Sequence, residues 1–251
     1  MNEILRSLHA RKSVRVFTGR EIPPADREAI LLAAAAAPTA GNQQLYTILD
    51  ITDQALKDRL AETCDHQPFI AKASMVLIFC ADFQKWIDVF TEGGCAPRQP
   101  GAGDLLLAVE DASIAAQNAV TAAESLGIGS CYIGDIMEQC ETHRGLLGLP
   151  GYVFPAVMLV FGYPTPQQLA RKKPERCALR HIVHENGYRR MDGAELREMF
   201  AKETASQSFE EWAAAFCRRK YNSGFAREMT RSAEEYLRPF GCAPARPEKG
   251  V

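Results

Sequence analysis

Residues 74–81 read SMVLIFCA and form the clearest candidate for a buried strand in this sequence. A short apolar run of this kind, rich in β-branched and aromatic side chains, is typical of a strand with both faces covered. Segments 128–133 and 154–161 (FPAVMLVF) predict two more strands, and LYTILDI at 45–51 is also β-like. We therefore expect one central sheet with few strands.

Helical segments surround these strands. Asn2 is the expected N-cap of the first helix, Asp104 caps a long helix that ends before Gly127, and Pro38 ends the alanine-rich one. Because helices and strands interleave without a strict βαβ rhythm and without repeats, an α+β sandwich fits best. The predicted helices cover residues 2–9, 23–38, 53–64, 104–126, 138–147, 192–204, 208–220 and 224–238.

Composition excludes several functional classes. The 251 residues are 47% apolar, and 29 Lys and Arg against 31 Asp and Glu give a net charge of −2, so no basic excess indicates nucleic acid. The eight cysteines form no CxxC pair and have no closely spaced histidine, so we expect no metal site. The N-terminus lacks an apolar signal region and no run is long enough to cross a bilayer, which predicts a cytoplasmic protein.

Four polar or glycine-rich stretches stand out: RKSVR (11–15), PTAGNQQ (38–44), GIGSCYIG (127–134) and KKPER (172–176). In an extended segment Arg11, Ser13 and Arg15 share one face, and two guanidiniums beside a hydroxyl would bind an anion. Taken singly, each stretch also has an ordinary explanation. RKSVR could be an edge strand protected by cations, PTAGNQQ a helix-stop turn, and KKPER a solvated loop. GIGSCYIG lacks the GxGxxG spacing of the dinucleotide fingerprint, so on its own it is a weak signal.

Together, the four stretches resemble the nitroreductase-like flavoprotein family, most closely its oxygen-insensitive nitroreductases and NAD(P)H-flavin reductases. Such chains carry an RxSxR start, a GNxQ loop, a GxGxxYIG strand end and a late KPxR. Residues 66–73 (HQPFIAKA), 146–164 and 183–188 (VHENGY) strengthen the resemblance, which covers nearly the whole chain. It implies a three-layer α-β-α sandwich with a mostly antiparallel sheet, bound FMN and an intertwined homodimer.

The resemblance also implies roles for the first stretch. Arg11 and Ser13 would hold the ribityl phosphate of FMN, because a guanidinium pairs bidentately with phosphate. Arg15 would lie beside the pyrimidine edge of the flavin, where negative charge collects on reduction. Lys12, between them, belongs to the same expected cofactor-binding set.

The later stretches supply the remaining expected contacts. Thr39 and Asn42 match the loop that touches the ribityl chain or ring edge, and Gln67 matches a ring-edge amide. Lys173 and Arg176 match the late phosphate clamp, although Glu175 is inserted where relatives often read KPR. The segment expected along the isoalloxazine ring consists of Tyr132, Ile133 and Gly134.

The implied function is an FMN-dependent NAD(P)H oxidoreductase that reduces nitroaromatics, quinones or flavins by ping-pong hydride transfer. The flavin carries the chemistry, so no catalytic side chain is required. A flavin-binding carrier or sensor with little turnover, or a specialised reductive branch of the same fold, remains the alternative. The electron acceptor and the choice between NADH and NADPH are open.

Further expectations concern the domains, one loop and one cysteine. Residues 1–190 would form the FMN-binding domain, and residues 191–251 a helical extension that packs on the dimer. The glycine- and proline-rich stretch 93–103 either borders a substrate pocket or is a plain surface connection. Cys131 lies beside the expected ring-contact segment, and since no cation flanks it in the sequence, a packed thiol is favoured over a redox role.

Overall fold

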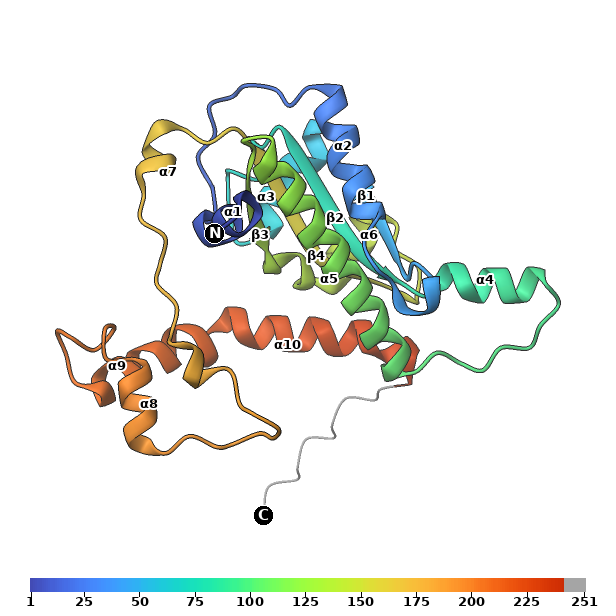
Figure 1. Ribbon diagram of the computed structural model, residues 1–251. Helices are drawn as coiled ribbons and strands as arrows, with labels where there is room; N and C mark the ends of the chain where they lie inside the picture. Colours follow the sequence, from blue (N-terminus) through green and yellow to red (C-terminus); the bar gives the residue numbers. More distant parts are fainter. Residues whose placement is uncertain (242–251) are drawn as a thin grey trace, which may run out of the picture. The chain divides into compact units, whose positions relative to one another are not determined.

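The computed structural model describes residues 1–241. Its sheet has four strands in the order β1-β2-β4-β3, every neighbouring pair being antiparallel. Figure 1 shows this sheet crossed by long helices. The strands are β1 (Tyr46–Asp50), β2 (Met75–Asp82), β3 (Gly129–Ile133) and β4 (Val153–Gly162). The predicted α+β class with an antiparallel sheet is confirmed.

The central strand β2 is buried along its whole length and separates two cores. Met75, Leu77 and Phe79 pack in one core, whereas Val76 and Ile78 pack in the other. This alternation follows directly from the period of two in a strand. Both faces are covered, so the apolar run at 74–81 carries no polar alternation.

Strand β4 interrupts its own alternation with a bulge. The register against β2 shifts between Phe79 and Cys80, and Pro155 pairs with Cys80 just after the shift. A proline has no N–H for the ladder, so inside a sheet it is found at bulges or edges. As a result, Ala156 faces one core and Met158 faces the other, two residues on.

Helices form the outer layers. One core contains residues of α2 (Pro24–Ala35) and α5 (Ala102–Ser125), and the other contains residues of α3 (Gln54–Thr63) and of the short η2 (Gly134–Met137). In Figure 1, α5 runs across the sheet beside α2. The predicted three-layer α-β-α sandwich is therefore confirmed.

The start of the long helix α5 differs from expectation. Gly101 occupies the N-cap, and its N–H donates to Asp104 Oδ2 at 2.8 Å, so Asp104 lies in the first turn and is not the cap. The alanine stripe of α5 is buried within the chain. It therefore permits close packing on α2 and the sheet and does not itself supply a dimer interface.

Two predicted helices lie close to their expected ranges, and two helices of the structure were not predicted. The prediction at 2–9 corresponds to α1 (Glu3–Ala10), and that at 138–147 to α6 (Cys140–Leu147). No helix was predicted for α4 (Gln84–Glu92) or for the short α7 (Pro166–Ala170). The stretch 93–103 leaves α4 and reaches the first turn of α5.

The described residues divide into two compact units, one of residues 1–171 together with residues 229–241, the other of residues 172–228. Helix α10 (Gly224–Leu237) begins in the second unit and ends in the first. In the first unit, the rings of Tyr236 and Phe154 pack edge to face, with their centroids 5.1 Å apart. The units meet after residues 171 and 228, whereas the predicted domain boundary lies at residue 190. That boundary stays a prediction.

The second unit contains short helical pieces. Helix α8 (Gly193–Met199) begins at the N-cap Asp192, and α9 (Phe209–Phe216) continues as a π-helical turn, η4 (Cys217–Tyr221). The rings of Phe200 and Trp212 lie 4.7 Å apart. Another short turn is η3 (Leu179–His181).

Across residues 1–241, no helix combines the length and the apolar character that crossing a bilayer requires.

Candidate cofactor site

The segment after α1 lies along the edge of β3. Ser13 forms a parallel bridge with Ser130, and Val14 N donates to Ser130 O at 2.9 Å. A second isolated bridge joins Phe17 to Pro164. The segment is therefore extended, as its alternation predicts, but it pairs only at these two points and is not a continuous strand.

Two glycines allow this close approach. A Cβ on Gly129 would lie 2.6 Å from Val14 Cγ2, and one on Gly162 would lie 2.7 Å from Phe17 Cδ1. Neither glycine has a left-handed backbone, so space and not conformation requires them. Gly129 begins β3 and Gly162 ends β4, and the two are paired across these neighbouring strands.

Arg11 carries the clearest sign of a missing partner. Its Nε and Nη2 are buried and have no hydrogen-bond partner among residues 1–241, and its guanidinium carbon lies 5.5 Å from the Tyr132 ring centroid. Buried guanidinium nitrogens are costly when unpaired, and a phosphate oxygen would satisfy them through charge-assisted hydrogen bonds. The residues present thus fit the phosphate group of a nucleotide-like cofactor.

Arg15 and Lys12 have different environments. The Arg15 backbone N–H donates to Gln168 Oε1 at 3.2 Å, and its guanidinium carbon lies 5.9 Å from the Phe69 ring. Lys12 Nζ donates to the carbonyls of Leu169 and Arg171 at 2.6 and 2.5 Å. Two of the three donors of this ammonium are therefore used to hold the end of α7.

Cys131 lies near Arg11 and Arg15. Burial raises the pKa of its thiol, while Arg15, Ser13 and Arg11 act in the opposite direction. The folded chain thus brings Arg15 and Arg11 near Cys131, although no cation flanks it in the sequence. Burial still dominates, so the thiol is protonated at neutral pH and behaves as a packed side chain.

The loop after α2 has an unusual backbone. Gly41, Asn42 and Gln44 all have positive φ, at 55°, 58° and 51°. A left-handed conformation costs a non-glycine residue roughly 1–2 kcal/mol, less for Asn. Thr39 helps to hold this shape, because its Oγ1 accepts from Gln44 N at 3.2 Å.

A buried carboxylate on α5 supports this loop. Asp111 is 2% exposed, and its two oxygens accept the N–H groups of Ala40 and Leu45 at 2.9 and 3.0 Å. The sequence reading missed this residue. The available signal was an acidic residue on the helix face otherwise occupied by buried alanines.

Gln67 links two of the predicted stretches. Its Nε2 donates to Cys64 O at 2.9 Å and to Asp135 Oδ2 at 3.0 Å, and Asp135 follows Gly134 directly. At the other end of the YIG segment, Tyr132 Oη donates to Gln117 Oε1 of α5 at 3.1 Å. Asp135 and Gln117 were not among the predicted site residues.

Lys173 and Arg176 belong to the second unit. There Glu175, the inserted residue, forms an ion pair with Lys202. The contact of Lys173 and Arg176 with the FMN phosphate stays a prediction.

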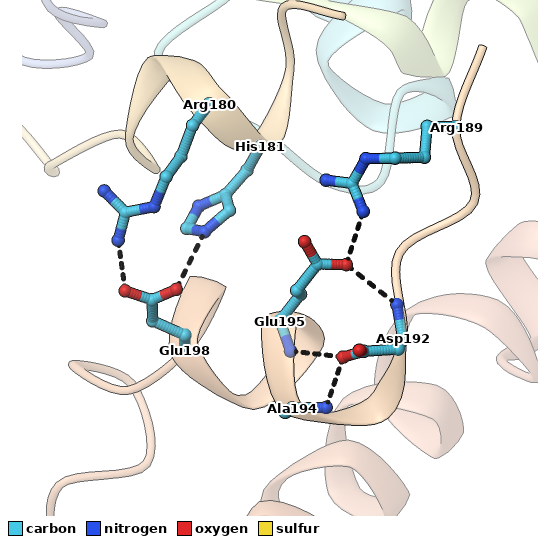
Figure 2. A network of polar contacts seen from close by, with 7 residues as sticks. All are labelled: Arg180, His181, Arg189, Asp192, Ala194, Glu195 and Glu198. Carbon is cyan, nitrogen blue, oxygen red and sulfur yellow. Dashed lines mark hydrogen bonds and ion pairs between the residues drawn. The ribbon is translucent and has the colours of Figure 1, made fainter.

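The second unit has its own polar network, drawn in Figure 2. The Glu198 carboxylate pairs with Arg180, and its Oε2 lies 3.7 Å from His181 Nε2. Arg189 Nη1 donates to Glu195 Oε2 at 2.7 Å, while Asp192 caps α8. These contacts tie the segment before α8 to the helix itself.

Comparison with known proteins places this site in context. The model of the nitroreductase family matches residues 8–163. The oxygen-insensitive NADPH nitroreductase of Salmonella typhimurium is 37% identical over 193 residues, 76% of this chain and 77% of its own. The FMN reductase [NAD(P)H] of Bacillus subtilis is 30% identical over 238 residues, 94% of this chain and 91% of its own.

A solved structure agrees with these sequence matches. The hypothetical oxidoreductase YcnD of Bacillus subtilis superimposes with a TM-score of 0.82 and 27% identity, over 98% of this chain and 100% of its own. The family match includes the Arg11–Arg15 segment, the Asp111-supported loop and the YIG strand end described above. The chain belongs to the nitroreductase family.

Proposed function

We propose that this protein is an FMN-dependent NAD(P)H oxidoreductase that reduces nitroaromatics, quinones or free flavin. The observation that carries the proposal is the pair of buried, unpartnered Arg11 nitrogens beside Ser13, in a member of the nitroreductase family. The nitroreductase, FMN reductase and NADPH-flavin oxidoreductase activities named for its relatives support the same chemistry.

The roles of the residues follow from their chemistry. Arg11 and Ser13 bind the phosphate of FMN, because a guanidinium pairs bidentately with phosphate. Arg15 stabilises negative charge at the pyrimidine edge of the ring. Lys12 acts on this site mainly by holding the end of α7, since its ammonium donates to two carbonyls there.

A second group of residues orients the ring and limits access to it. Thr39 and Asn42 lie on the left-handed loop, and Gln67 is fixed by its bonds to Cys64 O and Asp135. When bound, FMN supplies the hydride-accepting and hydride-donating ring. The remaining contact comes from the backbone of Tyr132, Ile133 and Gly134.

A homodimer is part of the proposal. Helix α1 has no buried residue, and Ile4 is 64% exposed although it lies on the apolar side of the helix. On α5, Leu106 is 63% exposed, and Leu107 and Ile114 are also exposed. Apolar side chains gathered on two neighbouring helices are stabilised when a second copy covers them.

The direct test is to purify the protein, release its ligand by heat and identify it by chromatography. We expect FMN, and oxidation of NADPH or NADH that depends on added menadione, with parallel double-reciprocal lines. Protein that holds no flavin and cannot be reconstituted with FMN contradicts the proposal. Bound FMN without NAD(P)H oxidation indicates the carrier or sensor alternative. The cytoplasm is the proposed location.

A further inference from the structure

We propose that Asp111 is a positioning residue for the cofactor, which fixes loop 39–45 in the shape that presents Thr39 and Asn42. The inference rests on the proposed function, because it assigns the loop to FMN. Asp111 itself is 2% exposed and lies on α5, beneath the loop. It therefore acts through the loop backbone and not by touching the ligand.

The Asp111 carboxylate binds one backbone N–H group at each end of loop 39–45. Asp111 Oδ1 accepts from Ala40 N at 2.9 Å, and Oδ2 accepts from Leu45 N at 3.0 Å. The residues between these two amides include Asn42 and Gln44, both left-handed. A backbone that is intrinsically unfavourable persists only when its surroundings hold it there.

The other supports of the loop act on different groups. Trp86 Nε1 donates to Gln43 O at 2.9 Å, and Lys85 Nζ donates to Gln44 O at 3.2 Å. These bonds hold carbonyls near the exit of the loop. Thr39 Oγ1 also joins the two ends of the loop, but it accepts a single N–H, that of Gln44, whereas the Asp111 carboxylate accepts one N–H from the entry and another from the exit.

The charge and symmetry of a carboxylate are essential to this arrangement. Both of its oxygens are acceptors, so it can receive two N–H groups at once. An asparagine has one acceptor oxygen and an NH₂ group that would face an N–H donor. Asp111→Asn therefore keeps the volume of the side chain and leaves one buried amide without a partner.

The experiment compares FMN affinity in three proteins. Asp111→Asn is the test variant. Asn118→Ala is the matched control, because Asn118 also lies on α5 and donates to a backbone carbonyl, that of Ala33 in α2, at 3.1 Å. Apoprotein is titrated with FMN, and flavin fluorescence gives the dissociation constant. The visible absorption and circular dichroism of the bound flavin report its orientation, and thermal unfolding of each apoprotein reports stability.

We expect Asp111→Asn to weaken FMN binding at least tenfold and to change the visible circular dichroism of the flavin that still binds. Asn118→Ala should keep the wild-type affinity within twofold and the wild-type spectrum, even where both variants lose similar thermal stability. The inference is overturned if Asp111→Asn binds FMN within twofold of wild type with an unchanged spectrum, or if Asn118→Ala loses as much affinity. Wild-type protein that binds no FMN overturns the proposed function, and this inference with it.

A second variant covers the case in which Asp111→Asn does not fold. Ala40→Pro removes one of the two N–H groups and leaves the carboxylate in place. Thr39, before it, is extended at φ −135° and ψ 154°, a conformation suited to a residue that precedes proline. We expect an affinity between wild type and a tenfold loss, with the same spectral change. An unchanged affinity and spectrum would overturn the role of the two hydrogen bonds that Asp111 accepts.

Discussion

Gln67 Nε2 donates a hydrogen bond of 3.0 Å to Asp135 Oδ2, and this bond joins the segment after α3 to the turn η2 that follows β3. Because Gln67 also donates to Cys64 O, both of its amide hydrogens are used. A glutamate at this position would bring two carboxylates together and would lose both donors.

We therefore expect Gln67→Glu to be less stable than Gln67→Leu at pH 7, although glutamate has the more similar shape. Repulsion raises the pKa of one of the two carboxyls, so the penalty should shrink as the pH falls and that group becomes protonated. Urea unfolding of both variants at pH 7 and pH 5 measures this. A difference between the variants that does not change with pH would show that the carboxylates do not interact.

Arg11→Ala should weaken FMN binding by about 1.5–3 kcal/mol, the usual contribution of a hydrogen bond to a charged group. The physical reason is the loss of two buried guanidinium nitrogens that have no partner within the described part of the chain. Arg15→Ala should weaken binding less and should lower the flavin reduction potential, since its cation would face the ring and not the phosphate.

Fluorescence titration and potentiometry measure these two effects. Arg20→Ala is the control, because Arg20 lies 4.0 Å from the Tyr163 ring centroid and has no proposed cofactor role. Equal losses of affinity in the Arg11 and Arg15 variants, with equal potentials, would contradict the division of roles.

Gly129→Ala should displace the cofactor segment. The new Cβ would lie 2.6 Å from Val14 Cγ2, and overpacking of this kind costs about 1–3 kcal/mol. Since Val14 lies between the two arginines, FMN affinity should fall together with stability. Gly145→Ala, on α6 with no heavy atom within 4 Å of the new Cβ, is the control and should be neutral or stabilising. Similar melting temperatures in both variants would show that the segment can move aside without cost.

The sequence predicted the sheet well because its signals are local. The run at 74–81 is apolar on both faces, and that alone identifies a covered strand. The change of face within β4 depends on the bulge at Pro155, which is a pairing event between two strands and has no local period. The same limit applies to the 11–17 segment, which pairs at two points because of glycines more than a hundred residues away.

The candidate site shows the same limit. The arginines of the first stretch and the YIG segment could be assigned from their motifs, and Arg11 does lie near Tyr132. Asp111 and Asp135 have no motif of their own. Each acts by accepting hydrogen bonds from a segment distant in sequence, so only the folded chain reveals the partner.

Buried His143 should make stability depend on pH. Burial lowers the pKa of His143 in the folded protein, whereas its hydrogen bond to Ile136 O acts the other way. The unfolded chain therefore binds a proton more readily than the folded chain. The contribution to stability is complete above the unfolded pKa of about 6.5 and is lost as the pH falls below it toward the lower folded pKa. Urea unfolding from pH 8 to pH 5 should show this loss. His143→Asn should remove that part of the pH dependence, and His66→Gln, at an exposed position, should keep it.

The last prediction concerns the second copy. Leu107 and Ile114 lie seven residues apart on one face of α5, and they are 43% and 41% exposed. Charged residues on this face would have to lose their water when a partner covers them, which is unfavourable without a compensating charge. The double variant Leu107→Glu/Ile114→Glu should therefore be monomeric by light scattering at micromolar concentration, whereas the wild type should be dimeric. Leu32→Glu, which changes an apolar residue that is 63% exposed on α2, is the matched control and should stay dimeric. A double variant that remains dimeric would exclude this face of α5 from the interface, and a monomeric wild type would exclude the dimer itself.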